Sequence, residues 1–249
     1  MTKNNELINN KESLCIWGMG YLGYSNLVKY SNHGINVLAT DFGSETTRLD
    51  EIKKNNFPSN KLKNDFIHHK FSKPKFSNLN IVKNNKNVFN KKIALHIMCN
   101  SESLYFHKNT KNILLNWLIN NKKIVFKNKP IFVIEFINSP GTISNDFIYV
   151  LNKNKIKLNK DYDLIFSPRK DWNFDEFNSN KIRPFWSSNA KAANKFREVL
   201  EITGDQPYEV KDLKNLEVLS NLDSSISHVS NMLINQLSKS YNELNFYDI

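Results

Sequence analysis

The chain has 249 residues, of which 40% are hydrophobic, and its formal net charge is +11. No apolar run approaches the ~20 residues that span a bilayer, and residues 1–12 (MTKNNELINNKE) lack the apolar core of a signal peptide. We therefore expect a cytoplasmic protein with one large domain, or one domain and an appendage, because domains usually contain about 100–200 residues.

The positive charge raises the question of nucleic acid. Only four of the 35 cations are arginines, and the lysines are scattered among asparagines along the whole chain. A nucleic-acid-binding surface is usually clustered and interleaved with aromatic residues, so we expect a solvated lysine surface and no nucleic-acid partner. Cys15 and Cys99 lie in or beside apolar runs, which favours buried thiols over a disulfide or a metal site.

Short apolar runs alternate with helical patterns along the chain, and this alternation predicts a parallel sheet with helices on both faces. Strands are predicted at 14–17, 35–40, 93–98, 131–137, 164–166 and 207–210, and helices at 22–33, 44–54, 113–118, from 140 onward, 190–203 and 213–244. The first helix ends at Gly34, the second is capped by Ser44, and residues 56–90 give little signal.

This pattern predicts an α/β fold: a Rossmann-like, doubly wound, mostly parallel sheet followed by a long C-terminal helix. The expected domains are 1–210, Rossmann-like, and 211–249, the long helix. The apolar residues of the last helix recur every three or four positions. We expect it to pack on the sheet domain or on a second subunit, as in a homodimer.

Glycine is scarce, with seven in the chain, yet three of them fall within six positions at Gly18, Gly20 and Gly23. In a dinucleotide-binding unit the first glycine permits a tight turn, the second lets the backbone approach a pyrophosphate, and the third allows close helix–strand packing. Here the motif follows a predicted strand and precedes a predicted helix, which is the required context.

An acidic residue that bonds the ribose hydroxyls is also needed, and Asp41 stands 18 residues after Gly23 at the end of the second predicted strand. No basic residue directly follows Asp41, so NAD is favoured over NADP. Cys99 ends another strand, where ligands bind in open α/β sheets. The predicted cofactor-binding residues are Gly18, Met19, Gly20, Tyr21, Leu22, Gly23, Asp41 and Cys99.

Five segments, in order, resemble the N-terminal half and central helix of the UDP-glucose/GDP-mannose dehydrogenase family: CIWGMGYLGYSNLVKYSNHGINVLATDF, IALHIMCNS, VIEFINSPGTI, DYDLIFSPRK and LEVLSNLDSSISHVSNMLINQLSKSYNEL. The resemblance implies an NAD-dependent oxidation of a nucleotide sugar at its C6 alcohol. It also implies a catalytic Cys, Lys, Asn, Thr and Glu.

The sequence departs from the family at each of these positions. Ile137 stands where the family has the threonine, Arg169 where it has the glutamate, and Ser220 and Ser224 where it has Lys and Asn. The cysteine-bearing segment and the nucleotide-sugar-binding domain would lie beyond Ile249. Neither Cys15 nor Cys99 aligns with the nucleophile, and no histidine has triad or metal-ligand spacing.

These departures leave several alternatives open. The protein is expected to bind NAD but to be inactive alone, as a degenerate family member. It would then serve as a regulatory or oligomerisation partner, or be half of a split UDP-sugar dehydrogenase. A decayed fragment and a polyanion-binding protein are weaker alternatives, and the latter is supported only by the net charge. A nucleotide sugar is a further ligand that the resemblance implies.

Overall fold

A computed structural model describes residues 12–41, 46–54, 76–83, 85–99, 113–136, 139–169 and 181–240. Ser44, Ile137 and the end of the chain after residue 240, on which sequence predictions rest, lie outside these ranges. Among the described residues, no helix is both long enough and apolar enough to cross a membrane.

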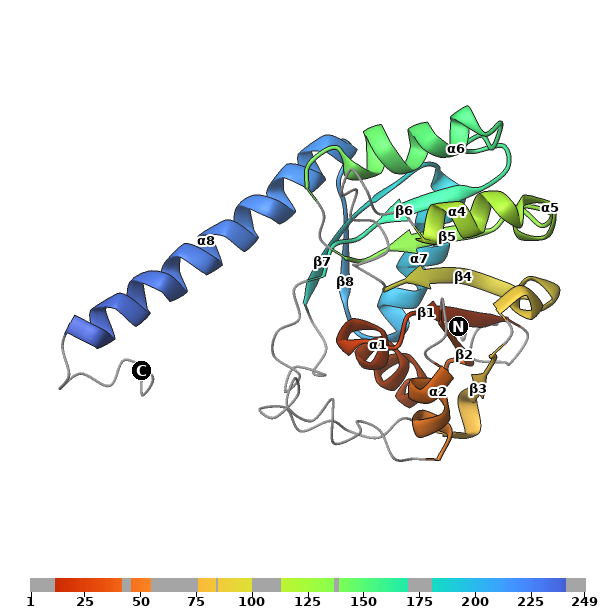
Figure 1. Ribbon diagram of the computed structural model, residues 1–249, viewed down its shortest axis with the longest axis horizontal. Helices are drawn as coiled ribbons and strands as arrows, with labels where there is room; N and C mark the ends of the chain where they lie inside the picture. Colours follow the sequence, from red (N-terminus) through yellow and green to blue (C-terminus); the bar gives the residue numbers. More distant parts are fainter. Residues whose placement is uncertain are drawn as a thin grey trace, which may run out of the picture.

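Eight strands form one sheet with the order β3-β2-β1-β4-β5-β6-β7-β8 (Figure 1). They are β1 (Ser13–Trp17), β2 (Val37–Thr40), β3 (Leu79–Ile81), β4 (Ile93–Met98), β5 (Ile131–Ile134), β6 (Asp163–Phe166), β7 (Ile182–Ser187) and β8 (Gln206–Glu209). Strands β1 to β6 are parallel, β7 is antiparallel to β6, and β8 is parallel to β7. The predicted doubly wound, mostly parallel α/β sheet is confirmed.

The helices are α1 (Tyr21–Asn32), α2 (Thr46–Lys53), α4 (Ile113–Asn120), α5 (Lys122–Val125), α6 (Tyr149–Lys153), α7 (Ala190–Ile202) and α8 (Leu213–Ser240). A π-helical segment, η4 (Thr142–Ile148), precedes α6, and two short 3-10 segments, η1 (Phe76–Asn78) and η2 (Asn85–Asn90), flank β3. The first helix ends as predicted, because Gly34 follows it at a φ of 80°.

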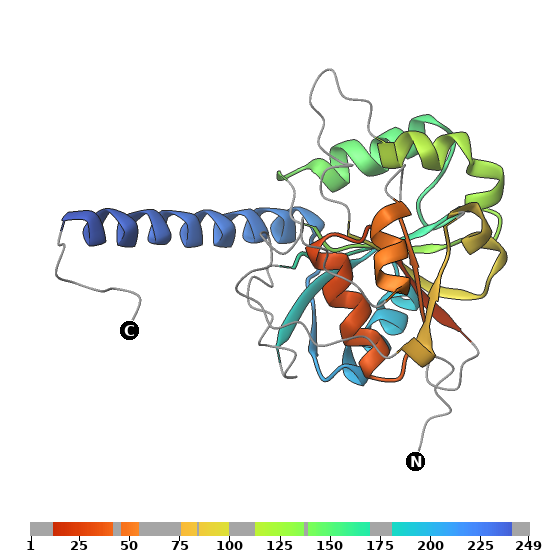
Figure 2. The ribbon, with the colours of Figure 1, turned by 60° about the horizontal axis from the view of Figure 1, so that its bottom comes forward.

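Side chains alternate across the sheet, so each strand contributes to two hydrophobic layers. Leu14 and Ile16 of β1 join the layer that contains α1, α2 and α7, while Cys15 and Trp17 join the layer under α4, α5 and α6. Figure 2 shows α1 on one side of the sheet and the α4–α6 segment on the other.

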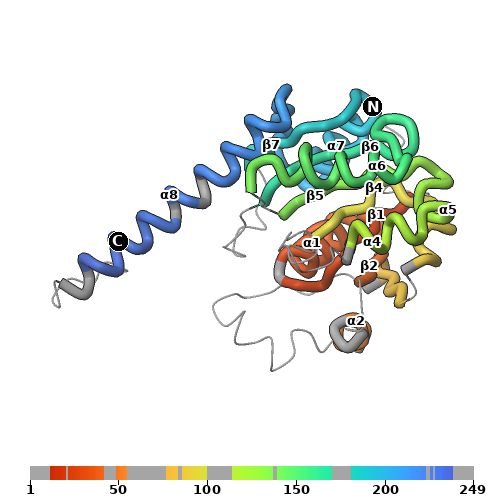
Figure 3. The backbone as a smooth tube through the Cα atoms, turned by 45° about the horizontal axis from the view of Figure 1, so that its top comes forward, coloured from red at the N-terminus to blue at the C-terminus, as the bar shows by residue number. Residues whose placement is uncertain are grey.

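Within the described part of the chain, helix α8 is anchored to the domain at its beginning, where it contacts β7 and η4. Leu213, Leu216, Glu217 and Ser220 are buried, and the helix then extends away from the sheet (Figures 1 and 3). From Leu219 onward it exposes an apolar stripe, which we define as Leu219, Leu222, Ile226, Val229, Leu233 and Leu237. Of the two predicted packing partners, the described part of the sheet domain therefore covers the start of the helix.

Some local predictions were wrong in detail. The fourth predicted strand ends at Ile134 instead of residue 137, and the helix after Pro140 begins as a π-helix. Strand β7 was not predicted, because Pro184 interrupts its pattern. The domain division at residue 210 stays a prediction.

Candidate functional site

The glycine motif forms the turn between β1 and α1, at the carboxyl edge of the sheet. Gly18 directly follows β1 and has a φ of 90°, a conformation that residues with a Cβ rarely adopt. Its N–H donates to the carbonyl of Thr40, at the end of the neighbouring β2, over 3.0 Å. The turn is therefore fixed to the sheet beside the end of the second strand.

Gly20 is the residue that caps α1, and the space beside it is open. A Cβ added to Gly20 would meet no atom within 4 Å, and the cap carries no side-chain hydrogen bond. The first N–H groups of a helix lack acceptors within the helix, and the first turn of α1 contains no acidic residue. This end of α1 can therefore receive an anion from outside the chain.

Gly23 is required by packing. A Cβ added there would lie 1.7 Å from the carbonyl oxygen of Gly18 and 3.5 Å from the Cβ of Cys99. No side chain fits at this distance, so glycine is the one residue that lets α1 lie against the turn. This geometry is the one assigned to the third glycine of dinucleotide-binding motifs.

Asp41 lies beside the glycine turn, as the sequence spacing suggested. Its Oδ2 accepts a hydrogen bond of 3.1 Å from the backbone N–H of Met19, and the residue is partly exposed. The side chain of Met19 is fully buried in the layer under α1. Met19 therefore helps to position Asp41 and presents no side chain to a ligand.

The remaining predicted residues lie nearby. Leu22 is partly buried against the α1 layer, and Tyr21 begins α1. Cys99 follows β4, is 7% exposed, and its Sγ accepts a bond of 3.3 Å from Nδ2 of Asn26. Burial raises the pKa of the Cys99 thiol well above its ordinary value, which favours its protonated form.

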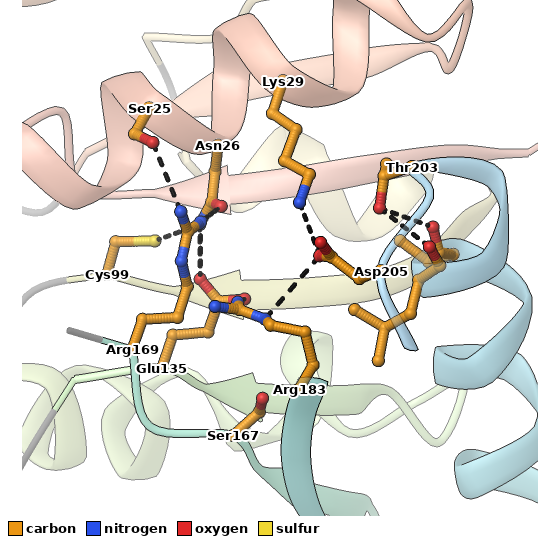
Figure 4. Close-up of polar contacts among 12 residues, drawn as sticks. Ser25, Asn26, Lys29, Cys99, Glu135, Ser167, Arg169, Arg183, Thr203 and Asp205 are labelled. Atoms are coloured by element: carbon orange, nitrogen blue, oxygen red, sulfur yellow. Dashed lines mark hydrogen bonds and ion pairs between the residues drawn. The ribbon is translucent and has the colours of Figure 1, made fainter. Parts of the chain in front are cut away.

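A buried ionic network that no sequence pattern indicated lies between α1, the ends of β5 and β6, and the start of β7 (Figure 4). Glu135 is fully buried, 3.7 Å from Nη1 of Arg169 and 3.6 Å from Nη2 of Arg183. Asn26 donates to Glu135 and accepts from Arg169, and Arg169 also donates to Ser25. Buried charges are tolerated when they are paired and hydrogen-bonded, and the Glu135 carboxylate lies beside the guanidinium groups of two arginines.

The network continues to the far end of α1. Asp205 lies 3.7 Å from Nε of Arg183 and accepts a hydrogen bond from Lys29. Burial lowers the pKa of Lys29 to about 8, although the bond to Asp205 opposes this shift. The carboxylates of Glu135 and Asp205 therefore hold three cations inside the domain. One of these cations, Arg169, stands where the resembling family has a glutamate.

The long helix enters the site through Glu217. Its carboxylate is fully buried, and Oε1 accepts a bond of 2.7 Å from the N–H of Ile143, at the start of η4. Ser220, aligned with the catalytic lysine of the family, is 8% exposed and donates to the carbonyl of Glu217.

His96 packs among the aromatic side chains of Trp17, Phe89 and Phe132. His96 is buried, its Nδ1 accepts from the indole N–H of Trp17 over 3.2 Å, and burial lowers its pKa to about 3. Within the described ranges, no group of three or more His, Cys, Asp or Glu side chains is arranged to hold a metal ion.

Known proteins resemble this chain in their fold, at low sequence identity. No protein-family model and no curated protein sequence matches the chain. Among solved structures, it is similar to the NDP-N-acetyl-D-galactosaminuronic acid dehydrogenase of Methanosarcina mazei Go1, at 14% identity and a TM-score of 0.64, over 94% of this chain and 52% of that one. It is also similar to GDP-mannose dehydrogenase from Pseudomonas aeruginosa in a ternary complex, at 16% identity and a TM-score of 0.66, over 89% and 51%.

A third similar structure has a different activity. The imine reductase BcSIRED of Bacillus cereus BAG3X2 aligns with a TM-score of 0.60 at 10% identity, over 95% of this chain and 68% of that one. Likeness at such low identity establishes the architecture and leaves activity to the site itself. The chain thus has the fold of nucleotide-sugar dehydrogenases and spans about half the length of those that it matches.

Proposed function

We propose that this protein is an NAD-binding member of the nucleotide-sugar dehydrogenase family that acts in the cytoplasm and does not oxidise a nucleotide sugar by itself. The observation that carries the cofactor proposal is the turn from Gly18 to Gly23. Its last glycine is pressed against its first, and it ends at an open helix N-terminus beside Asp41.

The described residues fit a dinucleotide. The first-turn N–H groups of α1 would hold the pyrophosphate, and Gly20 leaves room for it. Asp41 would bond the adenosine ribose. When bound, NAD would supply a hydride acceptor; the chain's own contribution is binding and orientation. Phe42 follows Asp41, so no cation is present there to favour the 2′-phosphate of NADP.

The proposed lack of activity rests on Arg169 and Ser220, which differ from the residues of the family at the same positions. Arg169 is engaged with Asn26 and Glu135 inside the domain, and Ser220 is too short and too buried to stabilise an oxyanion as a lysine would. Loss of one oxyanion donor typically lowers the rate 10²–10³-fold. A nucleotide sugar stays a candidate ligand, and a split enzyme stays the alternative function.

Calorimetric titration tests cofactor binding. We expect saturable NAD binding, much weaker NADP binding, and at least tenfold weaker NAD binding by Asp41→Ala. The matched control is Asp50→Ala, because Asp50 is a surface acid on α2 whose partner is Lys83. A flat titration of the wild type, or equal losses in both variants, would contradict the proposal.

A second assay separates an inactive protein from half of an enzyme. UDP-glucose or GDP-mannose is mixed with NAD and the protein, and NADH absorbance is followed. We expect no NADH from this chain alone. NADH that forms only after a polypeptide with a Gly-x-Gly-x-x-His-Cys segment is added would favour the split enzyme, and NADH without it would refute inactivity.

We propose further that the apolar stripe of α8 pairs with α8 of a second copy. The stripe residues are 38–59% exposed except Val229, which is 63% exposed. A 28-residue helix is about 42 Å long at 1.5 Å per residue. Soluble monomers rarely expose a contiguous apolar surface of this kind, and two identical stripes are complementary to each other in chemistry.

Sedimentation analysis tests this pairing. Ile226→Asp places a charge in the stripe, and Asn231→Asp places the same charge on another side of the same helix. We expect a dimeric wild type, a monomeric Ile226→Asp variant and a dimeric Asn231→Asp variant. A wild type that stays monomeric at high concentration would exclude the pairing.

A further inference from the structure

A second concave surface lies at the opposite, amino-terminal edge of the sheet. It is a cavity of about 600 Å³ between the first two turns of α7, the start of β4 and the residues before β5. Cavities of about 300–1,000 Å³ are typical of small-molecule sites. We call it the lysine groove, after Lys91, Lys92, Lys129, Lys191 and Lys195, which line it.

The charges in the lysine groove are not balanced. Two glutamates share the lining with the five lysines. Glu12 lies 3.3 Å from Lys92 and 2.7 Å from Lys195, and Lys195 also pairs with Glu198. Asp163, which is buried at the start of β6, lies 3.2 Å from Nζ of Lys129.

Two of the five lysines of the groove, Lys91 and Lys191, are left without an acidic partner among the described residues. Lys91 and Lys191 are exposed, and neither forms an ion pair with any residue of the described ranges. They approach the same cavity from different parts of the chain, one from the turn before β4 and the other from α7. The fold therefore gathers cations that lie 100 positions apart.

Lys191 lies in the first turn of α7, where an acidic residue would stabilise the helix better than a lysine. Asn189 caps α7 through a bond of its side chain from the N–H of Ala192, so Lys191 is in the first turn. The N-terminus of a helix carries a partial positive charge, and a cation there is unfavourable. An anion in the groove would offset this repulsion, because it would lie beside the ammonium group of Lys191.

The rest of the lining is apolar or neutral. Phe89, Ile93, Ala94, Pro130 and Ile131 form part of the wall, and Asn128 and Asn194 add carboxamides. Such a wall accommodates an organic body, while the lysines accept its charged end. We propose that the lysine groove binds a small phosphorylated metabolite with at least two phosphate groups, at a site separate from the glycine turn.

Inorganic pyrophosphate is the probe for the test, and calorimetry at constant ionic strength is the measurement. The groove variant is Lys91→Gln with Lys191→Gln. The control is Lys211→Gln with Lys214→Gln, two exposed lysines beside and at the start of α8, which change the net charge by the same amount. All four side chains are exposed, so we expect both variants to fold.

We expect pyrophosphate to bind the wild type saturably, at least tenfold more weakly to the groove variant, and within twofold of the wild type to the control. We also expect NAD affinity to be unchanged in the groove variant, and saturating NAD to leave pyrophosphate binding intact. Absence of saturable binding, or equal losses in both variants, would overturn the proposal.

Displacement by NAD would place the anion at the glycine turn and would likewise overturn the proposal. If NAD fails to bind at all, the proposed cofactor function fails, whereas the lysine groove is still decided by the two lysine variants. The two proposals therefore have separate outcomes.

Discussion

Arg169 and Glu135 face each other inside the domain, with Nη1 of the arginine 3.7 Å from Oε2 of the glutamate, where two neighbouring strands end. The arginine side chain is 3% exposed and the glutamate side chain is fully buried. The aligned family position holds a second carboxylate, which would repel Glu135 in this environment. The change from the family's glutamate to Arg169 is thus matched by an ion pair with Glu135 in the structure.

The first prediction concerns this pair. Arg169→Glu restores the family residue but buries two carboxylates together, and we expect it to destabilise the fold by about 3–5 kcal/mol, the usual result of breaking a buried ion pair. Arg197→Glu is the control, because the Arg197–Glu209 pair is much more exposed. Denaturant unfolding measures both. A destabilisation no larger than that of Arg197→Glu would show that the network does not depend on Arg169.

Two glycines of the motif are expected to behave differently. Gly23→Ala places a methyl group on the carbonyl of Gly18, so we expect loss of stability and of NAD binding together. Gly20→Ala meets no atom of the chain. We expect it to stay within about 1 kcal/mol of the wild type in stability and to bind NAD more weakly. Normal NAD affinity in Gly20→Ala would argue against an anion at the start of α1.

Glu217 is expected to hold α8 on the domain. Glu217→Ala leaves the buried N–H of Ile143 without its acceptor, and an unsatisfied buried donor costs about 1–3 kcal/mol. We expect a lowered thermal midpoint for Glu217→Ala and almost no change for the exposed Glu201→Ala. Glu217→Gln keeps one acceptor oxygen and should lie between them. Equal midpoints for all variants would contradict the anchoring role.

The stability of the protein should fall in acid partly because of His96. Burial lowers its folded-state pKa to about 3 from an ordinary value of 6.5, so below pH 6.5 the unfolded chain binds a proton that the folded chain does not. Stability is therefore lost as the pH falls from 6.5 towards 3, by at most about 1.4 kcal/mol per pH unit. Unfolding of His96→Gln, whose side chain does not titrate, should show a shallower pH dependence. Parallel curves would refute the prediction.

Both cysteines should be unreactive in the folded protein. Cys15 is fully buried and Cys99 nearly so, and burial raises both pKa values well above the ordinary value. We expect no rapid reaction with a disulfide reagent under native conditions and two reactive thiols per chain in guanidinium chloride. A fast-reacting native Cys99, lost in Cys99→Ser, would reopen the question of a catalytic thiol.

Much of the fold could be predicted because its signals are local. The apolar run before Gly18, the spacing of α1 and the glycine at position 34 each depend on neighbouring residues. Strand β7 was missed since Pro184 lies inside it, and β3 is only three residues long. Its pairing with β2 is a tertiary contact that no short pattern reveals.

The sequence by itself determined the strand–turn–helix unit, the spacing from Gly23 to Asp41 and the departures at Arg169 and Ser220. Only the tertiary structure decided what these residues contact. Arg169 meets Asn26 across 143 positions of the chain, Glu217 meets Ile143 across 74, and the cations of the lysine groove come from separate elements. Long-range partners depend on how the elements pack, and packing is a property of the whole chain.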